Sequence, residues 1–166
     1  MLSERFNFND NLTWALMQRL SIPLWLKNVN KLKSLCELVV KNEYKNNTSD
    51  DVTRPKCEVT ALWYILLGKM AILQKLYKVA PGQEKLAEFF GKNFEDKKTQ
   101  VVAGKNAMAL VPKKKYTLSM GFFLLANDLK GAIQIALDRT KDPTMAVLLC
   151  KIHDPQNETK CIDSVL

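Results

Sequence analysis

The 166-residue sequence predicts an all-α fold, in which short helices stack side by side like a segment of an α-solenoid. Three observations lead to this prediction. Apolar residues recur at helical spacing along most of the chain, strand-like alternation is almost absent, and glycine, proline or polar residues interrupt the pattern at helix-sized intervals. The composition, with 47% apolar and 25% charged residues, is that of a folded globular protein. We therefore expect about eight or nine helices of roughly 8–15 residues in a single domain that covers residues 1–166.

The N-terminal third contains two apolar stripes and one loop. Four apolar residues predict a helical face before Pro23, namely Leu12, Ala15, Leu16 and Leu20. Pro23 suits the first turn of the next helix, because proline has no amide hydrogen to leave unpaired there. The following stripe, which ends near Tyr44, consists of Leu32, Leu35, Cys36 and Val39. The polar stretch over residues 45–56, with Pro55 near its end, is predicted to be a surface loop.

Glycine and proline divide the rest of the chain into further helices. These are predicted over residues 57–68, 69–80, 84–91, 96–111, 113–126, 129–137 and 143–153. The apolar residues of the segment before Pro112 are Val101, Val102, Met108 and Leu110. We expect Asn127 or Asp128 to cap the helix at 129–137, and Asp142 to cap the helix that begins with Pro143. Residues after about His153 lose the pattern and are predicted to be irregular.

Small residues recur among large apolar ones in "GFFLLANDLKGAIQIALDRTKDPTMAVLLCKIH", residues 121–153. They are Ala126, Gly131, Ala132, Ala136 and Ala146. Two interpretations are open: close packing of neighbouring helices, or an apolar cavity that holds a ligand. A ligand pocket needs polar groups that orient its ligand, and this stretch has almost none. The sequence therefore favours close packing.

The four cysteines, Cys36, Cys57, Cys150 and Cys161, contain no C-x-x-C pair. Cys36 and Cys150 lie on apolar helical faces, so we expect buried thiols, no disulfide and a reducing compartment. Residues 1–10 contain no apolar core of signal-peptide length. The longest unbroken apolar run, residues 61–67, is far shorter than the roughly 20 residues of a membrane span. These features predict a cytoplasmic protein without a membrane span.

Catalytic and cofactor-binding motifs are not evident. The single histidine, His153, near the end of an apolar helix is more typical of a surface or capping residue than of a catalyst. The scattered cysteines do not supply a zinc ligand set at motif spacing. Gly68-Lys69 and Gly104-Lys105 lack the earlier glycine and the following Ser or Thr of a phosphate loop. We predict no enzyme activity, no catalytic residue, no cofactor and no metal.

The net charge of +8 is concentrated in one segment, because residues 92–121 hold seven lysines against Glu95 and Asp96. The candidate partner-binding patch consists of Lys97, Lys98, Lys113, Lys114 and Lys115. Its simplest alternative is a solvated, solubilising face. A second alternative is binding of nucleic acid or another polyanion, since lysines suffice for phosphate contacts. Base reading uses mostly Arg, Asn and Gln, and no arginine lies in this segment, so nucleic acid is not favoured.

Several motifs together resemble the rabconnectin and DmX-like family, which includes the large subunit of the RAVE complex. The residues that carry the resemblance occur in order as Ala61-Leu62-Trp63-Tyr64, Lys105-Asn106-Ala107, Phe122-Phe123-Leu124-Leu125-Ala126 and Leu129-Lys130. The similarity covers roughly residues 10–153. Gly104 and the run from Pro112 to Lys115 differ from the usual family pattern.

The resemblance implies a function in assembly of the vacuolar and endosomal proton ATPase. It implies a non-catalytic cytosolic scaffold that binds protein partners, namely subunits of the ATPase or of its assembly complex. It also implies recruitment to vacuolar or endosomal membranes through those partners. Full-length members carry N-terminal β-propellers that this sequence lacks, so we expect the chain to be a fragment of a larger scaffold.

Overall fold

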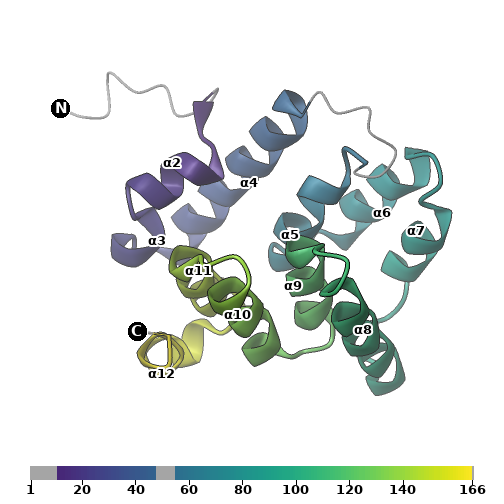
Figure 1. Ribbon diagram of the computed structural model, residues 1–166. Coiled ribbons are helices and arrows are strands. Elements are labelled where there is room, and N and C mark those ends of the chain that lie inside the picture. The colour runs from purple at the N-terminus through teal and green to yellow at the C-terminus, as the bar shows by residue number, and fades with distance from the viewer. Residues whose placement is uncertain (1–10, 48–54, 166) are drawn as a thin grey trace.

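The computed structural model describes residues 11–47 and 55–165, and these form eleven α-helices and one 3-10 helix without any strand (Figure 1). The all-α prediction is confirmed. Part of the predicted loop at 45–56 lies outside the described residues. The helices are α2 (Trp14–Arg19), α3 (Ile22–Trp25), α4 (Val29–Asn46), α5 (Glu58–Leu66), α6 (Met70–Val79), α7 (Glu84–Phe90), α8 (Lys97–Leu110), α9 (Tyr116–Leu125), α10 (Leu129–Asp138), α11 (Pro143–His153), η1 (Pro155–Asn157) and α12 (Glu158–Asp163).

The helices form two rows, each in chain order. Figure 1 shows α8, α9, α10 and α11 side by side, and each of these helices packs against the next. The second row consists of α4, α5, α6 and α7, and α5 packs against α9 to join the two rows. The short helices α3 and α12 pack against α11 at one end of the assembly.

Helix α9 is the centre of the core. Its residues 118–125 are all buried, because α5, α8 and α10 cover its different sides. A helix that is apolar on every side is stable in water only when it is surrounded in this way. Its one buried hydroxyl, on Ser119, donates a 2.8 Å hydrogen bond to the carbonyl oxygen of Ala107 in α8. The ring of Phe122 stacks on that of Phe89 at the end of α7.

The small residues allow close approach of neighbouring helices. Ala132, Ala136 and Ala146 are completely buried. A Cβ atom at Gly121 would lie 2.8 Å from Cδ1 of Ile65, and one at Gly131 would lie 2.7 Å from Cδ1 of Phe123. Both distances are shorter than a van der Waals contact, so a side chain at either position would force its neighbour to move. The packing interpretation is confirmed at these residues.

The predicted helix starts at the C-terminal end are confirmed. Asp128 caps α10 by accepting a 2.9 Å hydrogen bond from the amide of Gly131, whereas Asn127 adopts a left-handed backbone conformation with φ of 57°. Asp142 caps α11 by accepting a hydrogen bond from the amide of Met145. Its second carboxylate oxygen accepts a 2.9 Å hydrogen bond from the indole Nε1 of Trp14, which connects α2 to the start of α11.

The predicted apolar face before Pro23 is wrong in part, and most of the apolar residues noted before Pro112 are exposed. Leu12, which precedes α2, is buried, and Leu16 in α2 packs partly buried against the core. Ala15 and Leu20 are exposed, and Met17 is buried instead, because the chain turns before Trp14 and the stripe does not continue as one helix. In α8, Val101, Val102 and Met108 are exposed. The buried face of α8 consists instead of Ala103 and Ala107, which bring its backbone close to α9.

The predicted irregular C-terminal end is also wrong. Residues 155–157 form η1, and residues 158–163 form α12. Ile162 and Val165 pack against the core from this segment. A helix of six residues is too short to show an apolar stripe, so the sequence pattern gave no sign of it.

We predict that Ala136→Leu lowers the urea midpoint, with a loss of about 1–3 kcal/mol in the free energy of unfolding, because added methyl groups have no space in the core. The matched control is Ala109→Leu on the exposed side of α8, where the same enlargement meets solvent. Chemical denaturation followed by circular dichroism measures both. Equal midpoints for Ala136→Leu and the parent would show that there is room beside α10.

Candidate interaction site

An apolar groove lies between α3 and the first two turns of α4, with a volume of about 530 Å³. Its lining residues are Leu20, Ile22, Trp25, Leu26, Asn28, Asn30, Lys31, Ser34 and Leu35. The side chain of Trp25 is 61% exposed, and the neighbouring Leu20 and Leu24 are also exposed. Large apolar side chains are costly to leave in water, and their clustering around a concave surface is typical of binding sites.

The sequence analysis missed this groove. The apolar run Ile22-Pro23-Leu24-Trp25-Leu26 contains a signal that could have revealed it. Consecutive apolar residues cannot all lie on one face of a helix, so some of them must face solvent or a partner. Ile22 and Pro23 turn inward, and Leu24 and Trp25 turn outward.

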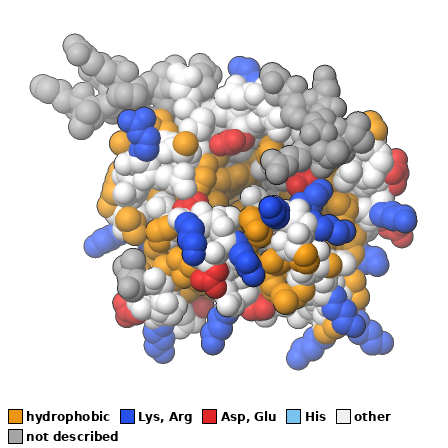
Figure 2. All heavy atoms as spheres, viewed as in Figure 1, with side chains coloured by type: hydrophobic (Ala, Val, Ile, Leu, Met, Phe, Trp, Pro, Cys, Tyr) orange, Lys and Arg blue, Asp and Glu red, His pale blue; other side chains and the backbone are white. Residues whose placement is uncertain are grey.

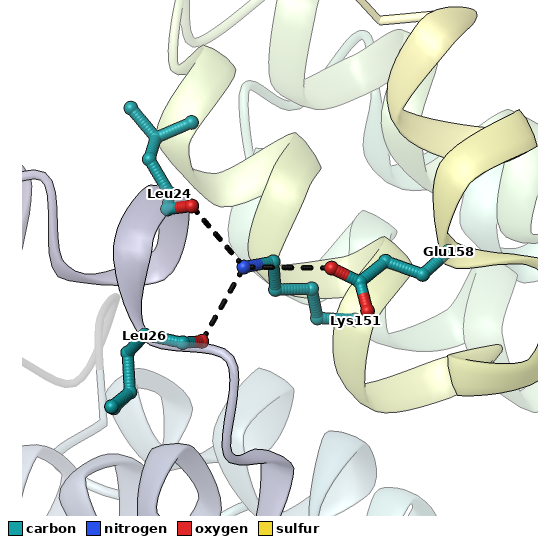
Figure 3. A network of polar contacts seen from close by, with 4 residues as sticks. All are labelled: Leu24, Leu26, Lys151 and Glu158. Atoms are coloured by element: carbon teal, nitrogen blue, oxygen red, sulfur yellow. Dashed lines mark hydrogen bonds and ion pairs between the residues drawn. The ribbon is translucent and has the colours of Figure 1, made fainter.

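Helix α3 is held in place by the buried ammonium group of Lys151 (Figure 3). The Nζ atom of Lys151 donates hydrogen bonds to the carbonyl oxygens of Leu24, at 3.3 Å, and Leu26, at 3.4 Å. Four residues are too few for a stable isolated helix, and a cation near the last carbonyls offsets the negative end of the helix. The side chain of Lys151 is only 3% exposed, and its Nζ atom forms an ion pair with Oε1 of Glu158 in α12 at 3.5 Å.

We predict that Lys151→Ala loosens α3 and lowers the free energy of unfolding by about 2–4 kcal/mol, since it removes the cation and leaves a cavity. Hydrogen–deuterium exchange should rise most over residues 22–27. Lys160→Ala on α12 is the matched control, because Lys160 is exposed. Unchanged exchange over residues 22–27 in Lys151→Ala would show that α3 is held by other contacts.

Cys150 in α11 and Cys161 in α12 form a disulfide, with their Cα atoms 5.8 Å apart. The prediction that Cys150 is a free thiol and that no disulfide forms is therefore wrong. Its cause is the missed helix α12, which folds back on α11 and brings Cys161 onto Cys150. Cys36 and Cys57 are free and buried, and burial raises the pKa of the Cys36 thiol to about 12 and that of Cys57 to about 11. Both thiols are therefore poor nucleophiles.

We predict that a reducing agent lowers the melting temperature. In the chain-entropy model, loss of a cross-link that closes a loop of this length lowers the free energy of unfolding by about 2–3 kcal/mol. Alkylation after unfolding should modify two cysteines without reductant and all four with it. Cys161→Ser should melt at the same temperature with and without reductant. Four modified cysteines without reductant would show that the bond does not form in solution.

The structure does not bring the five candidate lysines together. Lys97 and Lys98 begin α8, whereas Lys113, Lys114 and Lys115 follow its end. A helix of 14 residues is about 20 Å long, so the two groups lie far apart. The Nζ atom of Lys115 also forms a 3.0 Å ion pair with Glu58 in α5. On the face that Figure 2 draws, lysine and arginine side chains are spread among apolar and polar ones.

A second cleft, of about 540 Å³, lies between α2, α5, α9 and α11 and is lined by polar and aromatic residues that include Trp14 and Trp63. Its carboxylates contact other parts of the protein. Glu43 accepts a hydrogen bond from the amide of Trp14, Asp142 accepts one from the indole of the same residue, and Glu58 pairs with Lys115. These interactions make the second cleft a junction between helices, and the groove between α3 and α4 is the better candidate for a partner.

Reactive groups do not converge in the described part of the chain. No three residues among its His, Cys, Asp and Glu are placed to hold a metal ion. His153 is the last residue of α11, where partial desolvation lowers its pKa below the ordinary value. None of the helices described has both the length and the apolar character needed to cross a membrane.

The fold and these surfaces define an all-α protein of stacked helices whose most distinctive feature is a surface groove. The chain belongs to the family described as "RAVE protein 1 C terminal", whose model matches residues 2–166. This result confirms the family resemblance found in the sequence motifs.

Similar proteins include human "DmX-like protein 1", which is 30% identical over 152 residues and covers 90% of this chain. "Regulator of V-ATPase in vacuolar membrane protein 1" is 28% identical in Saccharomyces cerevisiae and covers 87% of this chain. The Schizosaccharomyces pombe protein of the same name is 27% identical and covers 86%. The chain spans only 5% of the human protein, 10% of the first yeast protein and 11% of the second.

Proposed function

We propose that this chain is a non-catalytic helical scaffold module of a V-ATPase assembly regulator and that it acts by binding protein partners. One observation carries the proposal: the family model matches nearly the whole chain, and the yeast relatives are named as regulators of V-ATPase. The exposed apolar groove supports binding of a partner rather than catalysis, since the described residues that line it include large apolar side chains and a single charged group, Lys31.

The partners proposed are subunits of the proton ATPase or of its assembly complex. We place the chain in the cytoplasm, with recruitment to vacuolar or endosomal membranes through these partners, and as one domain of a larger scaffold. The name of the yeast relatives supports the membrane assignment, because it refers to the vacuolar membrane. The disulfide between Cys150 and Cys161 is uncommon for a reducing cytoplasm and makes the redox state of this pair the point to measure in cells.

Polyanion binding remains a weaker alternative. The separation of the lysine groups by the length of α8 removes the compact basic surface that the sequence suggested. Each lysine that contacts phosphate releases counterions, so nucleic-acid binding would fall steeply with salt.

We predict that the immobilised 166-residue chain retains purified V-ATPase, either its peripheral ATP-hydrolysing sector or its membrane sector, at physiological salt. Unrelated duplex DNA should not be retained under the same conditions. The control is an immobilised unrelated helical protein of similar positive charge. Retention of DNA with a steep salt dependence, together with no retention of either ATPase sector, would contradict the scaffold proposal and support the polyanion alternative.

A further inference from the structure

We infer that the groove between α3 and α4 binds an amphipathic segment of a partner protein, in which large apolar side chains are flanked by Asp or Glu. The inference rests on the proposed function, because it names the chemistry of the partner that the scaffold binds. It draws on the shape of the groove, its charge and its rigidity.

The shape of the groove suits inserted side chains. Five of its lining residues are apolar, namely Leu20, Ile22, Trp25, Leu26 and Leu35. Trp25 stands at its edge with 61% of its surface exposed, and tryptophan is among the residues that contribute most to binding when a partner covers them. A concave site of about 530 Å³ can receive a few large apolar side chains of one helix or extended segment.

The charge around the groove is positive. Among the residues that the structure describes, Lys31 lines it and no acidic residue does. The lining residues fall between Leu20 and Leu35, and this stretch contains Lys27, Lys31 and Lys33 but no Asp or Glu. The amide groups in the first turn of α4, next to Asn28, add partial positive charge at the same place. Carboxylates beside the apolar anchors of a partner would complement this rim.

The groove is rigid before any partner binds. The indole Nε1 of Trp25 donates a 2.9 Å hydrogen bond to the carbonyl oxygen of Leu20, which fixes the ring. Asn28 caps α4 by accepting a 3.0 Å hydrogen bond from the amide of Lys31. Lys151 holds the carbonyl groups of Leu24 and Leu26 from behind. A preformed site loses little conformational entropy on binding.

Charge and shape argue against the two other occupants. A second copy of this chain carries a net charge of +8, so it would be repelled by a basic rim. A membrane surface favours apolar side chains that project from a convex face, whereas these residues surround a hollow.

The inference is tested with a fluorescent helical peptide of about 16 residues that has Leu and Phe at positions i, i+3, i+4 and i+7 and Glu elsewhere. Its counterpart has Lys in place of Glu. In the nuclear magnetic resonance spectrum of the full chain, which has three tryptophans, Trp25→Phe identifies the Trp25 indole signal. The Glu peptide should shift this signal and bind more tightly than the Lys peptide.

Two variants with matched controls measure the contribution of each part. Trp25→Ala should lower the affinity for the Glu peptide about tenfold or more. Met108→Ala, at a side chain with 63% exposure on α8, should leave the affinity unchanged. Lys31→Glu should weaken binding several-fold and reduce its salt dependence. Lys75→Glu on the exposed side of α6 should do neither.

Four results of the binding measurements on this chain would overturn the inference. These are equal binding of the Lys peptide, a Trp25 signal that the Glu peptide does not shift, a shift of that signal by phosphatidylserine vesicles but not by the peptide, and self-association that Trp25→Ala abolishes.

The test is separable from the proposed function. Failure to retain V-ATPase with normal peptide binding contradicts the proposed function alone, and equal retention by the parent and Trp25→Ala contradicts the inference alone.

Discussion

Helix α9 has apolar side chains on every side, so its stability in water depends on contact with other helices all around it. The small residues of its neighbours make that contact possible, because Ala103 and Ala107 in α8, and Gly131 in α10 next to Phe123, let the backbones approach. The two rows therefore meet at α9, which packs against α8 and α10 in its own row and against α5 in the other. Each row extends from α9 or its partner α5, and the groove between α3 and α4 lies at the end of the assembly.

The end of the assembly is stabilised by polar and covalent contacts rather than by the central core. Helix α3 is short and half exposed, and it is fixed by the ammonium of Lys151, which in turn contacts Glu158 of α12. The disulfide joins α12 to α11 at the residue next to Lys151. The C-terminal segment therefore supports the backbone that presents Trp25, although it lies behind the groove and not in it.

This arrangement separates two kinds of exposed apolar residue. On α8, Val101, Val102 and Met108 are exposed as a consequence of the alanines that face α9. At the groove, Leu20 and Trp25 surround a hollow with a basic rim and rigid walls. Exposure alone is therefore not what distinguishes the candidate site; the combination of shape, charge and fixed geometry does.

The family was indicated by a resemblance in ordered motifs. The sequence by itself also determined the helical class, the breaks at Gly68, Pro81 and Pro112, and the cap at Asp142, and it limited the cap of α10 to Asn127 or Asp128. These features depend on local backbone preferences and on periodicity, which a single chain reveals without knowledge of its contacts. Only the tertiary structure decided that most apolar residues of α8 are exposed, that Cys150 meets Cys161, and that Lys151 supports α3. Each of these depends on residues that are distant along the chain or on helices too short for a periodic signal, and contact between such segments is set by packing in three dimensions.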